Sequence, residues 1–90
     1  MRIEEFEQTV SDQLTRIGGD VRYNVKPETR GYTLTLSVDS GQYDASKFYT
    51  ETDVHLHSPQ LIRTQVTNLY KCLIQKVLDT NLGKGVMYAS

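Results

Sequence analysis

Asp53, His55 and His57 are the residues of this chain whose types and spacing could support metal chemistry. We expect residues 48–57 to form a β-strand, and residues two apart on a strand share one face at about 6.5–7 Å. Two neutral imidazoles on one face can bind a transition metal, with Asp53 as a ligand or as the hydrogen-bond partner of a ligand. The chain has no further histidine to complete such a site. The sequence therefore favours the alternative, a solvated strand face that carries both histidines without a metal.

Cys72 is the only cysteine, which excludes an internal disulfide and a zinc site built from several cysteines. A catalytic thiol needs a nearby base or a positive environment. Lys71 is adjacent but points to another side of the predicted helix, so we interpret Cys72 as a small, partly buried apolar residue. The chain also lacks a glycine-rich phosphate loop, a nucleophile elbow and a dense acid–base cluster. We therefore predict a protein that is not an enzyme and that needs no cofactor.

The six tyrosines point instead to recognition. Three of them fall at positions that the hydrophobic pattern places in the core: Tyr23, Tyr32 and Tyr70. The other half are expected to be exposed: Tyr43, Tyr49 and Tyr88. Exposed tyrosines are frequent at protein interfaces, although β-propensity alone also places tyrosine in strands. The predicted partner-binding residues come from the third strand, the loop before it and the C-terminal tail: Tyr43, Tyr49, Glu51, Asp53, His55, Met87 and Tyr88.

Basic side chains form a second set of candidates. In the alternative hypothesis of nucleic-acid binding, a basic edge near the first two strands would use Arg22, Lys26, Arg30, Lys47 and Arg63. The formal net charge is −1, with 10 basic against 11 acidic residues. No positive field covers the whole chain, so the sequence disfavours strong non-specific binding to nucleic acid.

Hydrophobic periodicity predicts the elements that position these residues. Residues 2–17 have apolar side chains at spacings of three and four, which predicts an amphipathic helix that ends at Gly18-Gly19. Residues 21–26 and 32–38 alternate between apolar and polar side chains, which predicts two half-buried strands in a hairpin. Pro27 is expected to end the first of them, because it lacks a backbone donor.

A third strand is predicted over residues 48–57. Its expected inward phase contains Phe48, Val54 and Leu56, whereas Tyr49 falls in the outward phase. Residues 42–46 are either the beginning of this strand or an ordered loop, and the pattern leaves both open.

Residues 58–80 are the longest periodic apolar segment. Ser58 is a preferred N-cap residue and Pro59 suits the first helical position, so a helix is expected to begin there. Its apolar stripe consists of Ile62, Val66, Leu69, Leu73 and Val77. Residues 85–90 are expected to form a short fourth strand or an extended arm.

These elements predict one small α+β domain over residues 1–90 with the order α-β-β-β-α, in which residues 82–90 are a tail. Each helix has one apolar stripe and each strand one apolar face. Both helices should therefore pack on the same face of a three-stranded antiparallel sheet and leave the other face in water.

The element order resembles that of double-stranded-RNA-binding domains. Such domains begin their second helix with a cluster of lysines, whereas residues 59–63 of this chain contain one basic residue, Arg63. We therefore do not transfer RNA binding to this chain. The order also resembles that of small phage tail-completion proteins and of some phage-encoded inhibitors of host machinery, a likeness that concerns the fold alone.

The leading hypothesis is a protein–protein interaction module, such as an adaptor, an assembly factor or an inhibitor of a larger protein, with a phage-encoded protein as one candidate. Binding would use the exposed sheet face, the 39–47 loop and the C-terminal tail. A sheet edge or the tail could also pair two copies of the chain. The sequence shows no secretory signal and no run of about 20 apolar residues, so we expect no membrane association. The expected location is the cytoplasm, which for a viral protein is the host cytoplasm.

Overall fold

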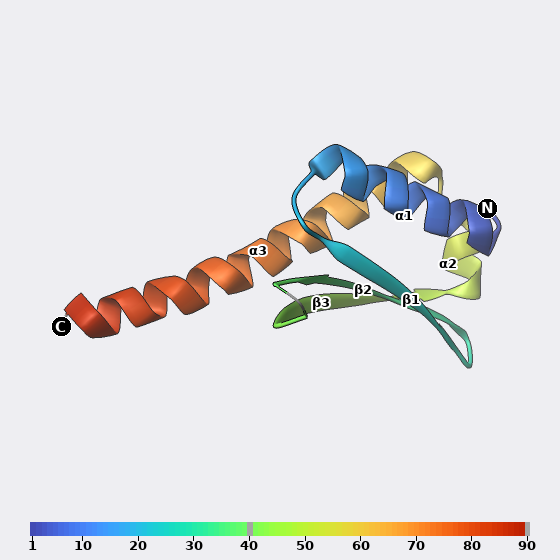
Figure 1. Ribbon diagram of the computed structural model, residues 1–90. Helices are drawn as coiled ribbons and strands as arrows, with labels where there is room; N and C mark the ends of the chain where they lie inside the picture. The colour runs from blue at the N-terminus through green and yellow to red at the C-terminus, as the bar shows by residue number, and fades with distance from the viewer. Residues whose placement is uncertain (40, 90) are drawn as a thin grey trace.

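Three antiparallel strands form a sheet in chain order, and the helices lie on one of its faces. The computed structural model describes the backbone of residues 1–39 and 41–89 and the side chains of residues 1–39 and 41–80. The elements are α1 (Ile3–Ile17), β1 (Arg22–Glu28), β2 (Gly31–Val38), β3 (Tyr43–Thr50), α2 (Glu51–Leu56) and α3 (Pro59–Ala89). Figure 1 shows α1 and α3 on the same side of the sheet. The α+β class and the α-β-β-β-α order are thus confirmed, with the short α2 as an additional element.

Helix α1 forms where the spacing of its apolar residues predicts it. Phe6, Val10 and Leu14 are buried on one stripe of the helix. The helix ends at Gly18, whose φ of 79° lies in the region that favours glycine. The amide of Gly18 donates to the carbonyl of Leu14 at 3.0 Å. Glycine thus ends α1 at the expected position.

Strands β1 and β2 form the predicted hairpin, but β1 continues past Pro27 to Glu28. The prediction that Pro27 ends the strand is wrong. β1 is an edge strand, and a proline whose missing N–H faces away from the neighbouring strand removes no hydrogen bond from the sheet. The turn is consequently tighter than expected, with Glu28 paired directly to Gly31.

The third strand begins and ends earlier than predicted. β3 spans Tyr43–Thr50, so residues 43–46 are strand, and residues 51–56 form helix α2. The prediction of a strand through residue 57 is wrong. Thr50 and Asp53 form a capping box, in which the Thr50 hydroxyl accepts from the Asp53 amide and the Asp53 carboxylate accepts from the Thr50 amide, both at 3.0 Å. This reciprocal cap satisfies backbone donors that a helix start leaves free, and it outweighs the weak alternation of the segment.

The side chains of β3 point to the opposite sides of the sheet from those predicted. Tyr49 is 1% exposed and packs in the core, whereas Phe48 is 48% exposed. The register fixes this phase, because Tyr49 pairs with Tyr32, and Ala45 with Leu36, on the side covered by the helices. Since side chains alternate along a strand, Phe48 must point to the other side.

Helix α3 is the longest helix, and it begins at the predicted position. Ser58 caps its beginning, and the Ser58 hydroxyl accepts from the Leu61 amide at 3.2 Å. Ile62, Val66 and Leu73 are fully buried. The helix continues through Ala89, so its backbone includes residues 85–89, where we expected a strand or an arm. The helix contains Gly83 and Gly85. Each glycine inside a helix lowers its stability by about 1 kcal/mol, which does not by itself end the helix.

The core is one cluster with contributions from every element except β1. Its buried apolar members are Phe6, Val10, Leu14, Leu34, Leu36, Ala45, Tyr49, Val54, Ile62, Val66 and Leu73. Tyr23 was predicted to be buried, but it is 40% exposed because the helices pack over β2 and β3. Among the residues described, no helix has a stretch long and apolar enough to cross a membrane.

Candidate functional site

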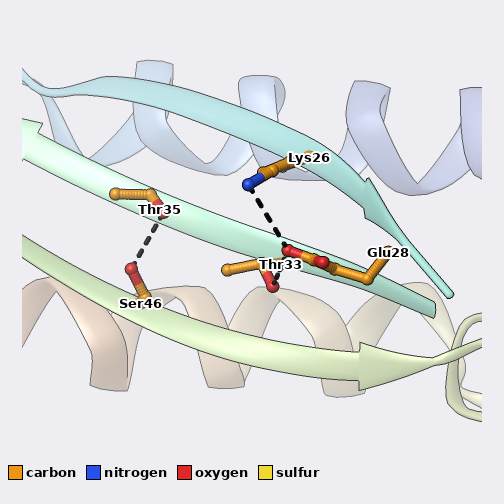
Figure 2. Close-up of polar contacts among 5 residues, drawn as sticks. All are labelled: Lys26, Glu28, Thr33, Thr35 and Ser46. Atoms are coloured by element: carbon orange, nitrogen blue, oxygen red, sulfur yellow. Dashed lines mark hydrogen bonds and ion pairs between the residues drawn. The ribbon is translucent and has the colours of Figure 1, made fainter. Parts of the chain in front are cut away.

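The sheet face opposite the helices is not covered by any described helix. We call it the open face (Figure 2). The strand registers place ten side chains on it: Arg22, Asn24, Lys26, Glu28, Thr33, Thr35, Ser37, Asp44, Ser46 and Phe48. Nine of the ten are polar, which agrees with the wet face expected from the sequence.

Short polar contacts connect the three strands across the open face. The hydroxyls of Thr35 and Ser46 lie 2.9 Å apart across the β2–β3 pair, and the Thr33 hydroxyl donates to Glu28 Oε1 at 3.3 Å. Lys26 Nζ lies 4.0 Å from the same carboxylate oxygen (Figure 2). An exposed ion pair of this kind contributes at most about 1 kcal/mol. These contacts hold hydrogen-bonding groups of all three strands in fixed positions along the open face.

Phe48 is the residue of the open face that the sequence analysis assigned to the opposite, inward side. It lies opposite Thr33 in the β2–β3 pair and is 48% exposed among polar neighbours. A half-exposed aromatic ring in a polar strand face is typical of a recognition surface. Ala45 and Tyr49 are four residues apart, so in a strand their side chains share one face and that of Phe48 lies on the other. Placing Ala45 and Tyr49 in the core would therefore have placed Phe48 on the open face.

The predicted metal-ligating residues do not share a strand face. Asp53 and His55 belong to α2 and His57 is its C-cap. Successive residues of a helix are rotated by about 100°, so side chains two apart point in nearly opposite directions. No group of three or more His, Cys, Asp or Glu side chains converges within the part of the chain whose side chains are described. The metal hypothesis depended on a strand face shared by these three residues, and this prediction is therefore wrong.

Asp53 has a structural role at the start of α2. Hydrogen bonds from the Thr50 amide and then from the Thr50 hydroxyl lower the pKa of Asp53 below its ordinary 3.8, and the charge of His57 acts in the same direction. The Asp53 carbonyl accepts from the His57 amide at 2.9 Å and also contacts His57 Nδ1. Asp53 and His57 thus hold the two ends of α2.

The structure separates the predicted partner-binding residues. Tyr49 is buried, so it cannot contact a partner, and burial followed by the charge of Asp53 raises the pKa of Tyr49 to about 12. Tyr43 is half-buried against the core instead of exposed. Glu51 and His55 are exposed on α2, on the helix side of the sheet. Met87 and Tyr88 lie outside the residues whose side chains are described.

The predicted basic residues also lie on different surfaces. Arg22 and Lys26 are on the open face, and Arg30 is in the β1–β2 turn. Lys47 is on the opposite side of β3, with its Nζ 5.5 Å from the centre of the Tyr49 ring. Arg63 is on α3, where it lines a shallow groove of about 270 Å³ with Gln13 of α1. No single face collects these five residues.

Cys72 is exposed on α3 instead of partly buried. It lines a shallow groove of about 290 Å³ between β3 and α3 with Ser46, Lys47, Gln65, Asn68 and Leu69. The groove is open to solvent, and among the side chains described none makes a hydrogen bond to the Cys72 thiol.

The fold and the open face define a small α+β domain with a one-sided three-stranded sheet. Comparison with models of known protein families, with curated protein sequences and with solved structures found no match. Arguments about function therefore depend on the geometry of the chain alone.

Proposed function

We propose that the chain is a non-enzymatic protein-binding module that contacts its partner through the open face. The observation that carries this proposal is Phe48, a large aromatic side chain that is 48% exposed on the edge strand β3 of an otherwise polar sheet face. Aromatic side chains dominate the binding energy of many interfaces, because they bury a large area at a small cost in conformational entropy.

The neighbours of Phe48 support a protein partner. The Thr33, Thr35 and Ser46 hydroxyls provide directional hydrogen bonds around the ring. Arg22 and Lys26 are balanced by Glu28 and Asp44, so the face has no strong charge of one sign. An exposed aromatic side chain beside polar groups of balanced charge is a common composition of a protein interface.

The expected binding regions outside the sheet face contribute less to this proposal. Asp39, Gly41 and Gln42 lie in a turn, in which the Gly41 amide donates to the Val38 carbonyl at 3.2 Å, and β3 begins directly after it. The tail side chains from residue 81 onward are not described. An adaptor, an assembly factor and an inhibitor of a larger protein all remain compatible with binding at the open face.

Phe48→Glu tests the proposal. It places a charge in the proposed interface without touching the core, and we expect it to weaken partner binding by about 2 kcal/mol, or roughly 30-fold. Leu56→Glu is the matched control, because Leu56 is 73% exposed on α2, away from the open face. Proteins bound from a lysate of the source cells should be retained by the wild type and by Leu56→Glu, but lost with Phe48→Glu. Equal retention by both variants would show that the open face is not the binding surface.

Nucleic-acid binding is the second candidate, and the geometry supports it less. Only Arg22 and Lys26 of the five basic residues lie on the open face, where Phe48 is the single aromatic side chain. Single-stranded nucleic acid is usually bound by several aromatic side chains within a positive groove.

A further inference from the structure

The two edges of the sheet differ, and the outer edge of β3 is closed. Asp53 Oδ2 accepts from the Thr50 amide at 3.0 Å, and Lys76 Nζ donates to the Asp44 carbonyl at 2.8 Å. Side chains of the same chain thus occupy outward-facing backbone groups at both ends of β3. Between them, Lys47 places a charged side chain on the helix-facing side of the strand, a feature that discourages the addition of another strand.

The outer edge of β1 is open. Along an edge strand, the backbone N–H and C=O groups of successive residues point alternately toward the neighbouring strand and away from it. Pro27 has no N–H, so it suits a position whose backbone points away from β2. Tyr23 and Val25 lie four and two residues before Pro27, so their backbone groups also point away from β2. Outside the pairing of β1 with β2, no backbone hydrogen bond in the described part of the chain reaches Tyr23 or Val25, and no helix packs extensively on β1. Six of the seven residues of β1 are exposed.

The sequence of β1 is complementary to itself in one antiparallel register. When two copies pair around Val25, Arg22 lies opposite Glu28 of the second copy, and the same ion pair recurs on the other side of the twofold axis. Sliding the strands by two residues one way places Arg22 opposite Lys26. Sliding them the other way places the two Lys26 side chains opposite each other. Charge therefore selects the register centred on Val25, because like charges directly opposite are destabilising.

The apolar side chains of β1 fit the same register. Tyr23 lies opposite Pro27 of the second copy, on the helix-facing side, with the two Val25 side chains between these pairs. Tyr23 is 40% exposed in the single chain. It also lines a shallow groove of about 180 Å³ between α1 and β1, together with Leu14 and Val21. Pairing would cover the exposed part of this apolar stripe, of which Val25 is already half-buried against the core.

We propose that the chain forms a homodimer in which the two β1 strands pair antiparallel around a twofold axis at Val25. The result is a six-stranded sheet with the order β3-β2-β1-β1-β2-β3. The dimer presents two open faces side by side on one sheet, so a partner could engage both Phe48 side chains. The pairing does not depend on the proposed partner binding, because Phe48 lies on β3.

Disulfide trapping tests both the dimer and its register. In a Cys72→Ser background, Val25→Cys places one thiol per chain on the twofold axis. Paired residues there have Cα atoms about 5.5 Å apart, within the span of a disulfide. Tyr23→Cys is the control on the same strand, because the two copies of position 23 would lie four residues out of register, about 13 Å apart. We expect mild oxidation to yield a covalent dimer from Val25→Cys and none from Tyr23→Cys.

The solution mass of the unmodified chain provides an independent measurement. Light scattering should give twice the mass of one chain, and Val25→Lys, which opposes two charges on the axis, should shift the protein to monomer. Phe48→Glu should remain dimeric, which separates this proposal from the proposed function. A monomer at all concentrations, or equal cross-linking at positions 23 and 25, would overturn the proposal.

Discussion

The Tyr49 hydroxyl is buried without a hydrogen-bond partner among the described atoms. The ring itself packs edge-on to Phe6, with centroids 5.0 Å apart, and to His57 at 6.3 Å. A buried hydroxyl that loses its water contacts costs free energy unless it finds a new partner. Tyr49 thus stabilises the core through its ring, and its hydroxyl works against that stabilisation.

Tyr49→Phe is expected to raise the free energy of unfolding by about 1 kcal/mol, because it removes the unpartnered hydroxyl and keeps the ring. Tyr49→Ala, which also removes the ring, should lower it by about 3–5 kcal/mol. Urea denaturation followed by circular dichroism measures both changes. A loss of stability in Tyr49→Phe would show that the hydroxyl has a partner, such as a bound water.

The capping box makes stability depend on pH. Because hydrogen bonds from Thr50 lower the pKa of Asp53, the folded state favours the ionised carboxylate. The resulting stabilisation is present above the ordinary pKa of 3.8 and is lost as the pH falls through the lower folded-state value. Asp53→Asn should therefore be less stable than the wild type at pH 7, and the difference should shrink below about pH 4.

Thermal unfolding of Asp53→Asn between neutral and strongly acidic pH checks this prediction. Glu51→Gln is the control, because Glu51 is an exposed acid in the same helical turn and takes no part in the capping box. A difference between Asp53→Asn and the wild type that does not change with pH would contradict the assigned role of the carboxylate.

At the scale of elements, the approach of β2 to the end of β3 depends on Gly31. A Cβ at this position would lie 2.0 Å from the Tyr49 carbonyl oxygen and 2.8 Å from the Thr50 Cα. Both atoms belong to the backbone and cannot rotate away. Gly31 therefore allows the β1–β2 turn to pack against the β3–α2 junction, where the Glu51 amide donates to the Arg30 carbonyl at 3.1 Å.

Gly31→Ala should lower the free energy of unfolding by about 3 kcal/mol, because the strands must shift to admit the methyl group. Gly41→Ala is the matched control. A Cβ there would meet nothing within 4 Å, and the positive φ of 86° alone should cost about 1 kcal/mol. Denaturant titration of both variants measures the difference, and equal losses would show that the clash is relieved at no cost.

For the molecule as a whole, the helical layer covers β2 and β3 and leaves β1 and the open face to solvent. The basic residues are divided among these surfaces, so no continuous positive patch forms from Arg22, Lys26, Arg30, Lys47 and Arg63. Affinity for nucleic acid arises mainly from clustered phosphate contacts. The distribution of charge therefore favours a protein partner over a nucleic acid.

Duplex RNA and duplex DNA should bind with a dissociation constant no tighter than about 10⁻⁴ M at physiological salt, the weak end of non-specific binding. Fluorescence anisotropy of labelled duplexes measures this value. Binding in the micromolar range that weakens steeply with added salt would contradict the prediction and would revive the nucleic-acid hypothesis.

The amino-acid sequence by itself determined α1, the beginning of α3, the β1–β2 hairpin and the packing of both long helices on one face of the sheet. Local signals carry this information: the apolar spacing of Phe6, Val10 and Leu14, the glycine at position 18, and the cap at Ser58. The wet character of the open face followed from the alternation of β1 and β2, so six of its ten residues could be assigned to it beforehand.

The tertiary structure alone decided the phase of β3, and with it the candidate site. Residues 43–57 contain no clean alternation, so the register with β2 determined that Tyr49 enters the core and that Phe48 faces solvent. A shift of one residue reverses every side chain of a strand, and only packing against Leu34 and Leu36 selects one of the two phases. The capping box of Thr50 and Asp53 places Asp53 and His55 in helix α2, with His57 as its C-cap. A site inferred from strand spacing alone could not survive that change, because side chains two apart share a face in a strand and diverge in a helix.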